Sequence, residues 1–349
     1  MSDRKNHHFV PQFYFRRFSA DGKSVCAMTK ATGRLIAQAP IKSQASKNNF
    51  YGTPEVENVL GEIEGECSKT LRTLTDLADP AMLDNEDVSR LLLYIALQRS
   101  RTMSARMNGQ NFQDKMARLQ LEVELNNSTE IDDDTKKLML ENLEHIGVDP
   151  VQAQRLQMSI AVEACQALED LHPIILDNKT NRPFIFGDAP VVFYNAYYRN
   201  VKLRGVLGLS TPGLLVVLPL SAEKCLMLVD SACYKIQKIR NNRVQLREFH
   251  DVAALNKLQL HAASSCIYFG DFQYSPYVSE IWRQEKQRFR PHAGVVVEAP
   301  GVDASNGESL GEIVHGFEPQ LPFLFSLSFL QHTVLGDKDY RIGRHEDMY

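Results

Sequence analysis

Apolar residues recur at three- and four-residue steps through much of residues 54–170, which is the spacing of one face of an α-helix. The first run begins at Pro54, a residue suited to the first turn of a helix. A second helix follows an acidic capping segment and is apolar nearly all round, so we expect it to be buried. The predicted helices cover residues 54–74, 86–107, 109–126, 132–146 and 149–170.

The N-terminal part of the chain predicts extended structure. Residues 7–18 are expected to be extended, because Pro11 disfavours a helical residue before it and aromatic residues alternate with polar neighbours. Residues 25–37 predict a β-hairpin whose turn contains Gly33. Three aromatic side chains of the extended segment are expected to be largely buried: Tyr14, Phe15 and Phe18.

After residue 172, short β-rich runs bounded by Gly, Pro and Asn replace the long helical stretches. A helix is predicted over about 248–264, and the Gly-, Pro- and acid-rich residues 291–312 predict a loop. Because helices and strands are grouped and do not alternate, we expect an α+β fold rather than a doubly wound sheet. The strand-like runs lie at residues 184–186, 190–194, 214–218, 225–229 and 266–269.

These patterns divide the chain into a core, residues 1–270, and a C-terminal extension, residues 271–349. Within the core, residues 1–52 predict an extended and hairpin unit, 53–170 a helical region and 171–270 a β-rich region. We expect one packed unit, in which the N-terminal segment docks on the β-rich region and the helices flank both.

Composition narrows the class of protein. The chain is 44% hydrophobic and 23% charged, as globular proteins are, and its formal net charge of −4 argues against a general nucleic-acid coat protein. It has no apolar run long enough to span a membrane and no apolar signal core, so we expect a soluble, cytoplasmic protein without membrane contact. The six cysteines are scattered without a CxxC pair, which indicates reduced thiols rather than disulfides or a zinc ribbon.

The densest group of chemically active side chains lies near the N-terminus. His7 and His8 point to opposite faces of an extended segment, so one of them can face a cleft as acid, base or ligand while the other packs. Gln12 and Arg16 follow, and an arginine there suits a phosphate or carboxylate ligand. The alternative is that the histidines are structural and Arg16 is a solvated surface residue.

Three charged residues of the helical region are further candidates. Glu57 and Glu64 are seven residues apart, so they share one side of the first helix, where they can reach an arginine or a metal ion. Plain surface carboxylates are the alternative. Arg101 follows the buried second helix, either as a favourable charge at its C-terminal end or as an anion-binding side chain that projects into a cleft.

Asp188 ends an apolar strand in the segment Phe-Ile-Phe-Gly-Asp-Ala-Pro, a place where catalytic and metal-binding carboxylates occur. An Asx-type turn would produce the same sequence. Asn256 is the inward polar residue of the helix predicted at 248–264 and a candidate ligand-binding residue.

We expect several of these groups to converge on one concave site, because an unpaired buried polar group costs about 1–3 kcal/mol. The expected members are His7 or His8, Gln12, Arg16, Arg101 and Asp188. Known signatures of nucleotide binding, serine hydrolysis, zinc proteolysis and EF-hand calcium binding are absent from the sequence.

The opening block His-His-Phe-Val-Pro-Gln-Phe-Tyr-Phe-Arg resembles that of a bacterial family labelled domain of unknown function four-two-three-eight. Members open with His-His/Tyr-x-Pro-Gln-x-Tyr-Leu-Arg-x-Phe, and here Phe15 replaces the usual Leu. The resemblance covers about residues 6–270 and implies that its separated motifs converge, without implying an activity. The matching segments are residues 7–16, 49–51, 98–102, 188–190 and 218–221.

Two main function classes stay open. The first is a phosphodiester hydrolase, as a metal-dependent nuclease of a bacterial defence or toxin-like system that acts on nucleic acid or a nucleotide. The second is a non-catalytic module that senses a ligand or a protein partner; group transfer from a nucleotide is a further alternative. For the hydrolase we expect catalytic His7, His8, Asp188 and Arg101, ligand-binding Gln12, Arg16 and Asn256, and Mg²⁺ or Mn²⁺ held by Asp188 and Glu64.

Overall fold

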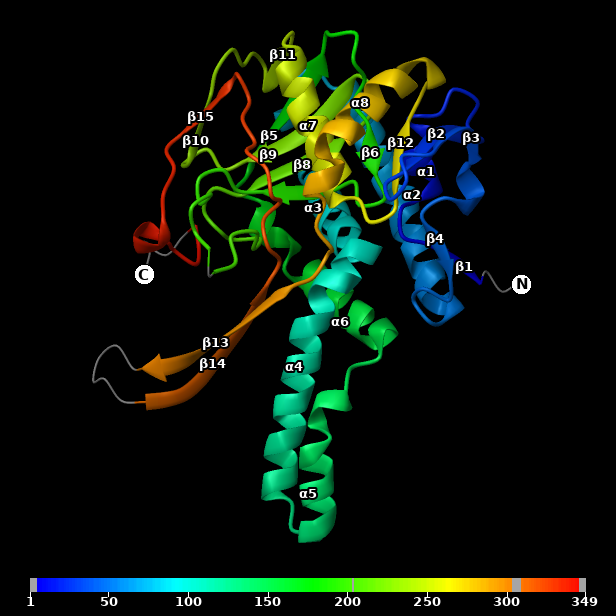
Figure 1. Cartoon of the computed structure of the whole chain (residues 1–349). Helices are drawn as coiled ribbons and strands as arrows, with labels where there is room; N and C mark the ends of the chain where they lie inside the picture. The colour runs from blue at the N-terminus through cyan, green and yellow to red at the C-terminus, as the bar shows by residue number, and fades with distance from the viewer. Residues whose placement is uncertain (1–4, 203, 303–308, 345–349) are drawn as a thin grey trace.

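A computed structural model of the chain describes residues 5–202, 204–302 and 309–344 (Figure 1). The predicted α+β class is confirmed, with helices and strands grouped along the chain. The helices are α1 (Gln12–Arg16), α2 (Pro54–Asp76), α3 (Asn85–Ser100), α4 (Met103–Asn127), α5 (Asp133–Glu141), α6 (Pro150–Glu163), α7 (Phe249–Ala262) and α8 (Ser275–Glu285).

The strands form one five-stranded, one four-stranded and three two-stranded sheets within the described residues. They are β1 (Asn6–His8), β2 (Ser24–Thr29), β3 (Leu35–Pro40), β4 (Ser46–Asn48), β5 (His172–Asn178), β6 (Phe186–Gly187), β7 (Val192–Tyr194), β8 (Leu215–Pro219), β9 (Lys224–Val229), β10 (Tyr234–Ile236), β11 (Arg243–Leu246), β12 (Cys266–Phe269), β13 (Val295–Val302), β14 (Ser309–Phe317) and β15 (Leu330–His332).

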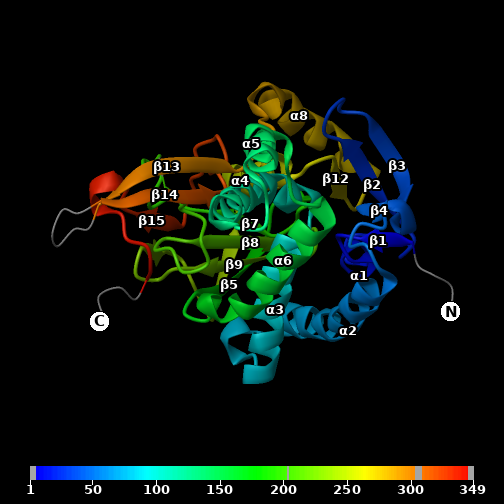
Figure 2. The ribbon, with the colours of Figure 1, turned by 90° about the horizontal axis from the view of Figure 1, so that it is seen from below.

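The five-stranded sheet has the order β11-β5-β9-β8-β7, antiparallel except for the parallel pair β11 and β5. Helices cover both of its faces. Ile175 packs with Leu91 of α3, whereas its neighbour Ile174 packs with Val252 of α7, because successive side chains of a strand point to opposite faces. Figure 2 shows α3 and α6 on one side of this sheet. Burial on both faces explains the unbroken apolar runs of its strands.

The four-stranded sheet has the order β3-β2-β12-β6 and is antiparallel. On one face, Ala27 and Tyr268 join the same hydrophobic core as α1. On the other face, Met28 and Ile267 pack with Ile281 of α8 and with α7. The extension beyond residue 270 is therefore packed into the core through α8.

The prediction that residues 7–18 are extended throughout is wrong. Strand β1 ends at His8, and Pro11 then precedes a helical turn, α1, with its carbonyl accepting hydrogen bonds from Tyr14 N and Phe15 N. Proline restricts the residue before it, not the residues after it, so a helix can begin there. The expected burial is confirmed, because Tyr14 and Phe15 are fully buried and Phe18 is 5% exposed.

Two other boundaries differ from the prediction. The break placed at residue 108 lies instead between α3 and α4, where the Thr102 side chain caps α4 by accepting from Ala105 N at 3.2 Å. The loop predicted at residues 291–312 contains β13 and β14, which pair over Val295–Val302 and Ser309–Phe317. Residues 303–308 of that segment lie outside the described residues.

Two structures project from the body of the molecule: α4 with α5, and the β13–β14 hairpin, which contacts α4 (Figure 1). Within the described ranges, no helix combines the length and apolar character needed to cross a membrane. All six cysteines are free thiols.

Candidate functional site

An open depression of about 730 Å³ lies where the beginning of the chain passes the N-terminal half of α2. One wall comes from β1 and α1, and the other from α2. The residues that line it are Lys5, Asn6, His8, Gln12, Phe13, Arg16, Glu57, Gly61, Glu64, Gly65 and Ser68. We call this depression the α2 groove.

The two adjacent histidines take different roles. His8 lines the α2 groove, whereas His7 is fully buried and its ring stacks on Tyr51, with centroids 5.8 Å apart. His7 Nδ1 accepts a hydrogen bond from Tyr51 N at 3.1 Å. Successive side chains of β1 point to opposite faces, so His7 packs in the interior and His8 faces the groove.

Three polar side chains form a row along the β1–α1 wall. His8 Nε2 lies 3.1 Å from the Lys42 carbonyl oxygen and 3.4 Å from Gln12 Nε2, so it donates to Lys42 in one tautomer and accepts from Gln12 in the other. Arg16 Nη2 donates to Gln12 Oε1 at 3.1 Å. Spacings of four residues align His8, Gln12 and Arg16 on one side of this segment.

The opposite wall is one face of α2. Glu57, Gly61, Glu64, Gly65 and Ser68 recur at three- and four-residue steps, which places them along that face. A Cβ atom added at Gly61 or Gly65 would meet no atom within 4 Å. The two glycines thus widen the groove and let a ligand approach the helix backbone closely.

Glu64 forms an ion pair with Arg101, which lies in the protein interior. The Arg101 side chain is 1% exposed and donates from Nη1 to Glu64 Oε1 at 2.8 Å and from Nε to Gln98 Oε1 at 3.0 Å. Burial, the largest single influence, would lower the pKa of Arg101, but the charge and hydrogen bond of Glu64 together with Tyr51 and Tyr94 outweigh it, so that pKa lies above its usual value. The guanidinium is charged throughout the physiological range.

Hydrogen bonds through Tyr51 and Gln98 connect Arg101 to the N-terminal segment. Tyr51 donates from its hydroxyl to the Arg101 carbonyl oxygen at 3.2 Å, and Gln98 Nε2 donates to the Phe9 carbonyl oxygen at 2.9 Å. Burial raises the pKa of Tyr51, so its hydroxyl stays protonated. Arg101 Nη2 is buried and has no hydrogen-bond partner among the described residues. Arg101 thus touches Glu64 and does not line the groove, which corrects its prediction as a residue that meets the ligand directly.

Asp188 lies outside the α2 groove, which contradicts the predicted convergence. Its carboxylate is 2% exposed and accepts from Ser264 N at 2.7 Å, Ser264 Oγ at 2.8 Å and Ser265 N at 2.8 Å. Burial raises the pKa of Asp188 and these hydrogen bonds oppose the rise. The carboxylate holds the turn before β12 to the end of β6, which is a structural task.

Asn256 is also structural, which corrects its prediction as a ligand-binding residue. It is fully buried, accepts from Ile185 N at 3.0 Å, and donates to the Pro183 carbonyl oxygen at 2.9 Å and to the Tyr277 hydroxyl at 3.0 Å. These bonds connect α7 to the segment that leads into β6 and use both N–H donors and the carbonyl oxygen of the amide.

The predicted cation at Asp188 and Glu64 gains no support from this arrangement, because each carboxylate serves a different set of partners. In the part of the chain that the structure describes, no group of three or more His, Cys, Asp and Glu side chains is arranged to hold a metal ion. Metal dependence therefore stays a prediction.

Sequence reasoning missed Lys5, Gly61, Gly65 and Ser68 as residues of the groove. A signal was present in the two glycines, which interrupt a long helix at a cost of about 1 kcal/mol each relative to alanine. Such a cost on one helix face indicates that something must approach that face closely.

Comparisons with known proteins agree with the resemblance seen in the opening block. No curated protein and no solved structure matches the chain significantly. The model of the family described as protein of unknown function (DUF4238) matches residues 6–272, which include β1, every residue of the α2 groove except Lys5, and both large sheets. The chain therefore belongs to the DUF4238 family.

Proposed function

We propose that this protein is a phosphodiester hydrolase whose reaction takes place in the α2 groove. One observation carries the proposal: His8, Arg16 and Glu64 line one depression, and Glu64 is held by the buried Arg101. A fixed carboxylate, a histidine and an arginine can supply the base, the acid and the positive charge that acid–base cleavage of a phosphodiester uses.

Each group has a distinct role in the proposed reaction. Glu64 removes a proton from the attacking water, whose oxygen forms a bond to phosphorus. The bond between phosphorus and the leaving oxygen breaks, and protonated His8 transfers its proton to that oxygen. Arg16, with Lys5 at the same groove, stabilises the negative charge of the phosphoryl oxygens.

Arg101 is a positioning residue in this scheme. Its bond to Glu64 fixes the carboxylate, and Gln12 orients both His8 and Arg16. A divalent cation, Mg²⁺ or Mn²⁺, is compatible with the proposal through Glu57 and Glu64, since carboxylate oxygens are its preferred protein ligands. A nuclease of a bacterial defence or toxin-like system is the biological form of this activity that we propose.

The test is hydrolysis of bis(4-nitrophenyl) phosphate and of short labelled RNA and DNA strands, with EDTA and with added Mg²⁺ or Mn²⁺. We expect His8→Ala and Glu64→Gln to lower kcat by at least about 100-fold. The matched controls His145→Ala and Glu122→Gln change exposed residues outside the groove and should leave kcat unchanged. A protein that cleaves none of these substrates under any metal condition would refute the proposal.

A second candidate, a ligand-sensing module, is favoured by the mutual hydrogen bonds of His8, Gln12 and Arg16, which preorganise one groove wall before any ligand binds. It predicts saturable binding of a phosphorylated ligand such as a mononucleotide without turnover. Loss of that binding in Arg16→Ala, with no cleavage by the unmodified protein, would support this alternative over hydrolysis.

A further inference from the structure

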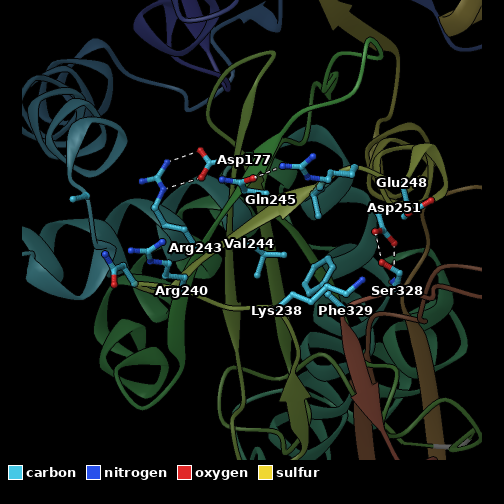
Figure 3. A pocket seen from close by; sticks show the side chains of 14 residues that line it. Asp177, Lys238, Arg240, Arg243, Val244, Gln245, Glu248, Asp251, Ser328 and Phe329 are labelled. Carbon is cyan, nitrogen blue, oxygen red and sulfur yellow. Dashed lines mark hydrogen bonds and ion pairs between the residues drawn. The ribbon is translucent and has the colours of Figure 1, made fainter.

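A second cleft, of about 490 Å³, lies along the edge strand β11, apart from the α2 groove. Figure 3 shows Arg240 and Arg243 at one end of this β11 cleft and Asp251 with Ser328 at the other. Val244 lies between the two ends, so the cleft has a partly apolar floor and a polar rim.

The turn before β11 sets two arginines side by side. Asn241 and Asn242 have φ values of 51° and 50°, as a type I′ turn requires. Arg240 and Arg243 flank this turn and exchange two backbone hydrogen bonds, each 3.0 Å long. Their side chains therefore emerge from directly opposite positions, an arrangement that destabilises the turn unless a negative charge lies nearby.

Of these two arginines, Arg243 pairs with a carboxylate of the protein, that of Asp177. Arg243 donates to both oxygens of Asp177, at 2.8 and 2.5 Å, and this bidentate pair neutralises it. The side chains of Arg240 and of Lys238 are exposed and make no hydrogen bond or ion pair with other described residues. They leave positive charge at this end of the cleft uncompensated.

The other charged residues that line the cleft do not neutralise the positive charge of Lys238 and Arg240. Arg247 is exposed at the other end of β11 and donates only to Gln245 Oε1, at 3.2 Å. Asp251 is 1% exposed and its carboxylate accepts from Ser328 N and Oγ at 2.7 and 2.6 Å. Three exposed cations at the rim, Lys238, Arg240 and Arg247, thus outnumber the two carboxylates without a cationic partner among the described residues, those of exposed Glu248 and buried Asp251.

We propose that the β11 cleft binds the phosphate backbone of a nucleic-acid strand. This binding is independent of the hydrolysis proposed for the α2 groove. The backbone of β11 rises about 3.3 Å per residue, so Arg247 is anchored about 13 Å from Arg243 and from Arg240, which pairs with Arg243 across the turn. Cations spread over that length suit the repeated phosphates of a strand better than one small anion. Phe249 is 57% exposed and follows the rim residue Glu248 in the sequence, so it is a candidate ring for base stacking.

The test is fluorescence anisotropy of short labelled single-stranded RNA and DNA with the full chain, between about 50 and 200 mM salt. We expect the double variant Lys238→Ala/Arg240→Ala to bind about tenfold more weakly and to lower the salt slope by about 1.4, or about 0.7 for each lost contact. Lys137→Ala/Arg283→Ala removes the same charge from exposed positions elsewhere and should bind like the unmodified protein.

A second readout and two competitors show where the strand binds and what the cleft recognises. Lys238→Ala/Arg240→Ala should hydrolyse bis(4-nitrophenyl) phosphate like the unmodified protein, which distinguishes the β11 cleft from the α2 groove. Absence of binding, or an equal loss in both double variants, would overturn the proposal. So would inorganic phosphate or polyglutamate that displaces the strand at equal charge concentration, because the site would then recognise a single anion or an acidic chain.

Discussion

At the scale of single residues, the ion pair of Arg101 and Glu64 joins the interior of the protein to its surface. The Arg101 side chain is 1% exposed and lies in the interior, whereas that of Glu64 is 24% exposed and lines the α2 groove. A charge removed from water needs its partner, since an isolated buried ion is costly. Stability and the position of the carboxylate therefore depend on the same contact.

Replacing Arg101 with methionine should lower the free energy of unfolding by about 2–4 kcal/mol, because it removes one partner of a partly buried ion pair. Urea unfolding measures this loss. The double variant Arg101→Met/Glu64→Gln should recover part of it, since the remaining partner is then neutral. A single variant as stable as the unmodified protein would show that the pair contributes nothing.

A second residue-scale prediction concerns pH and Lys30. Its Nζ donates to the carbonyl oxygens of His261 and Ala263 at 2.9 and 2.5 Å, and burial lowers its pKa to about 8. In the unfolded chain the pKa is about 10.4, so between these values the unfolded chain binds more protons than the folded protein. Lys30 therefore contributes a free energy of unfolding that rises with pH from about 8 to 10, by about 1–3 kcal/mol.

Buried tyrosines and cysteines, whose pKa values burial raises, produce the opposite slope, so the measurement is a difference. Urea unfolding of the unmodified protein and of Lys30→Met is compared at pH values from 7.5 to 9.5. The free energy of unfolding of the unmodified protein, minus that of Lys30→Met, should rise with pH. Parallel pH profiles of the two proteins would contradict the lowered pKa.

At the scale of elements, the short helix α1 is held by aromatic packing rather than by its own length. Five residues form too little helix to be stable alone. Phe15 contacts Phe186 and Tyr268 edge to face, with centroids 5.2 and 4.8 Å apart, and Phe18 lies 4.5 Å from Phe186. Burial against the four-stranded sheet therefore fixes α1, and α1 in turn presents Gln12 and Arg16 to the groove.

Phe15→Ala should lower the free energy of unfolding by about 3–5 kcal/mol, because it leaves a cavity among these rings. Phe272→Ala is the matched control, since Phe272 is 44% exposed and its loss should cost less than about 1 kcal/mol.

Deletion of residues 1–18 removes α1 and its aromatic side chains and should make the protein unfold or precipitate. A truncated chain with the thermal midpoint of the full one would show that α1 is not needed.

At the scale of the whole molecule, the C-terminal part completes the core that the earlier elements begin. Phe325 and Phe329 are 2% and 1% exposed and pack in one cluster with Tyr194 and Val252. The Tyr194 hydroxyl donates to the Phe323 carbonyl oxygen at 2.9 Å. The five-stranded sheet thus has part of its cover from residues beyond 320.

A chain that ends at residue 270 should lack a cooperative thermal transition, because it exposes the apolar surface that these aromatic residues cover. Circular dichroism against temperature and limited proteolysis, each compared with the full chain, measure this. A shortened chain with the same transition would show that the division into core and extension at residue 270 separates independent parts.

The sequence by itself determined most of the elements, because periodicity and turn chemistry are local properties. The helical spacing of residues 54–170, the hairpin around Gly33 and the apolar strands after residue 172 predicted elements that the structure contains. The candidate site was predictable where its residues are neighbours in one segment, as His8, Gln12 and Arg16 are.

Only the tertiary structure decided what the remaining polar residues do. Asp188 and Asn256 carry the same local signals as a catalytic carboxylate and a ligand-binding amide, yet their partners, Ser264 and Ile185, lie about 70 residues away in sequence. A buried polar group must find a partner, and the sequence around it does not tell whether that partner is a ligand or a distant turn. Long-range packing makes that choice, as it does for Arg101, which faces Glu64 and not a ligand.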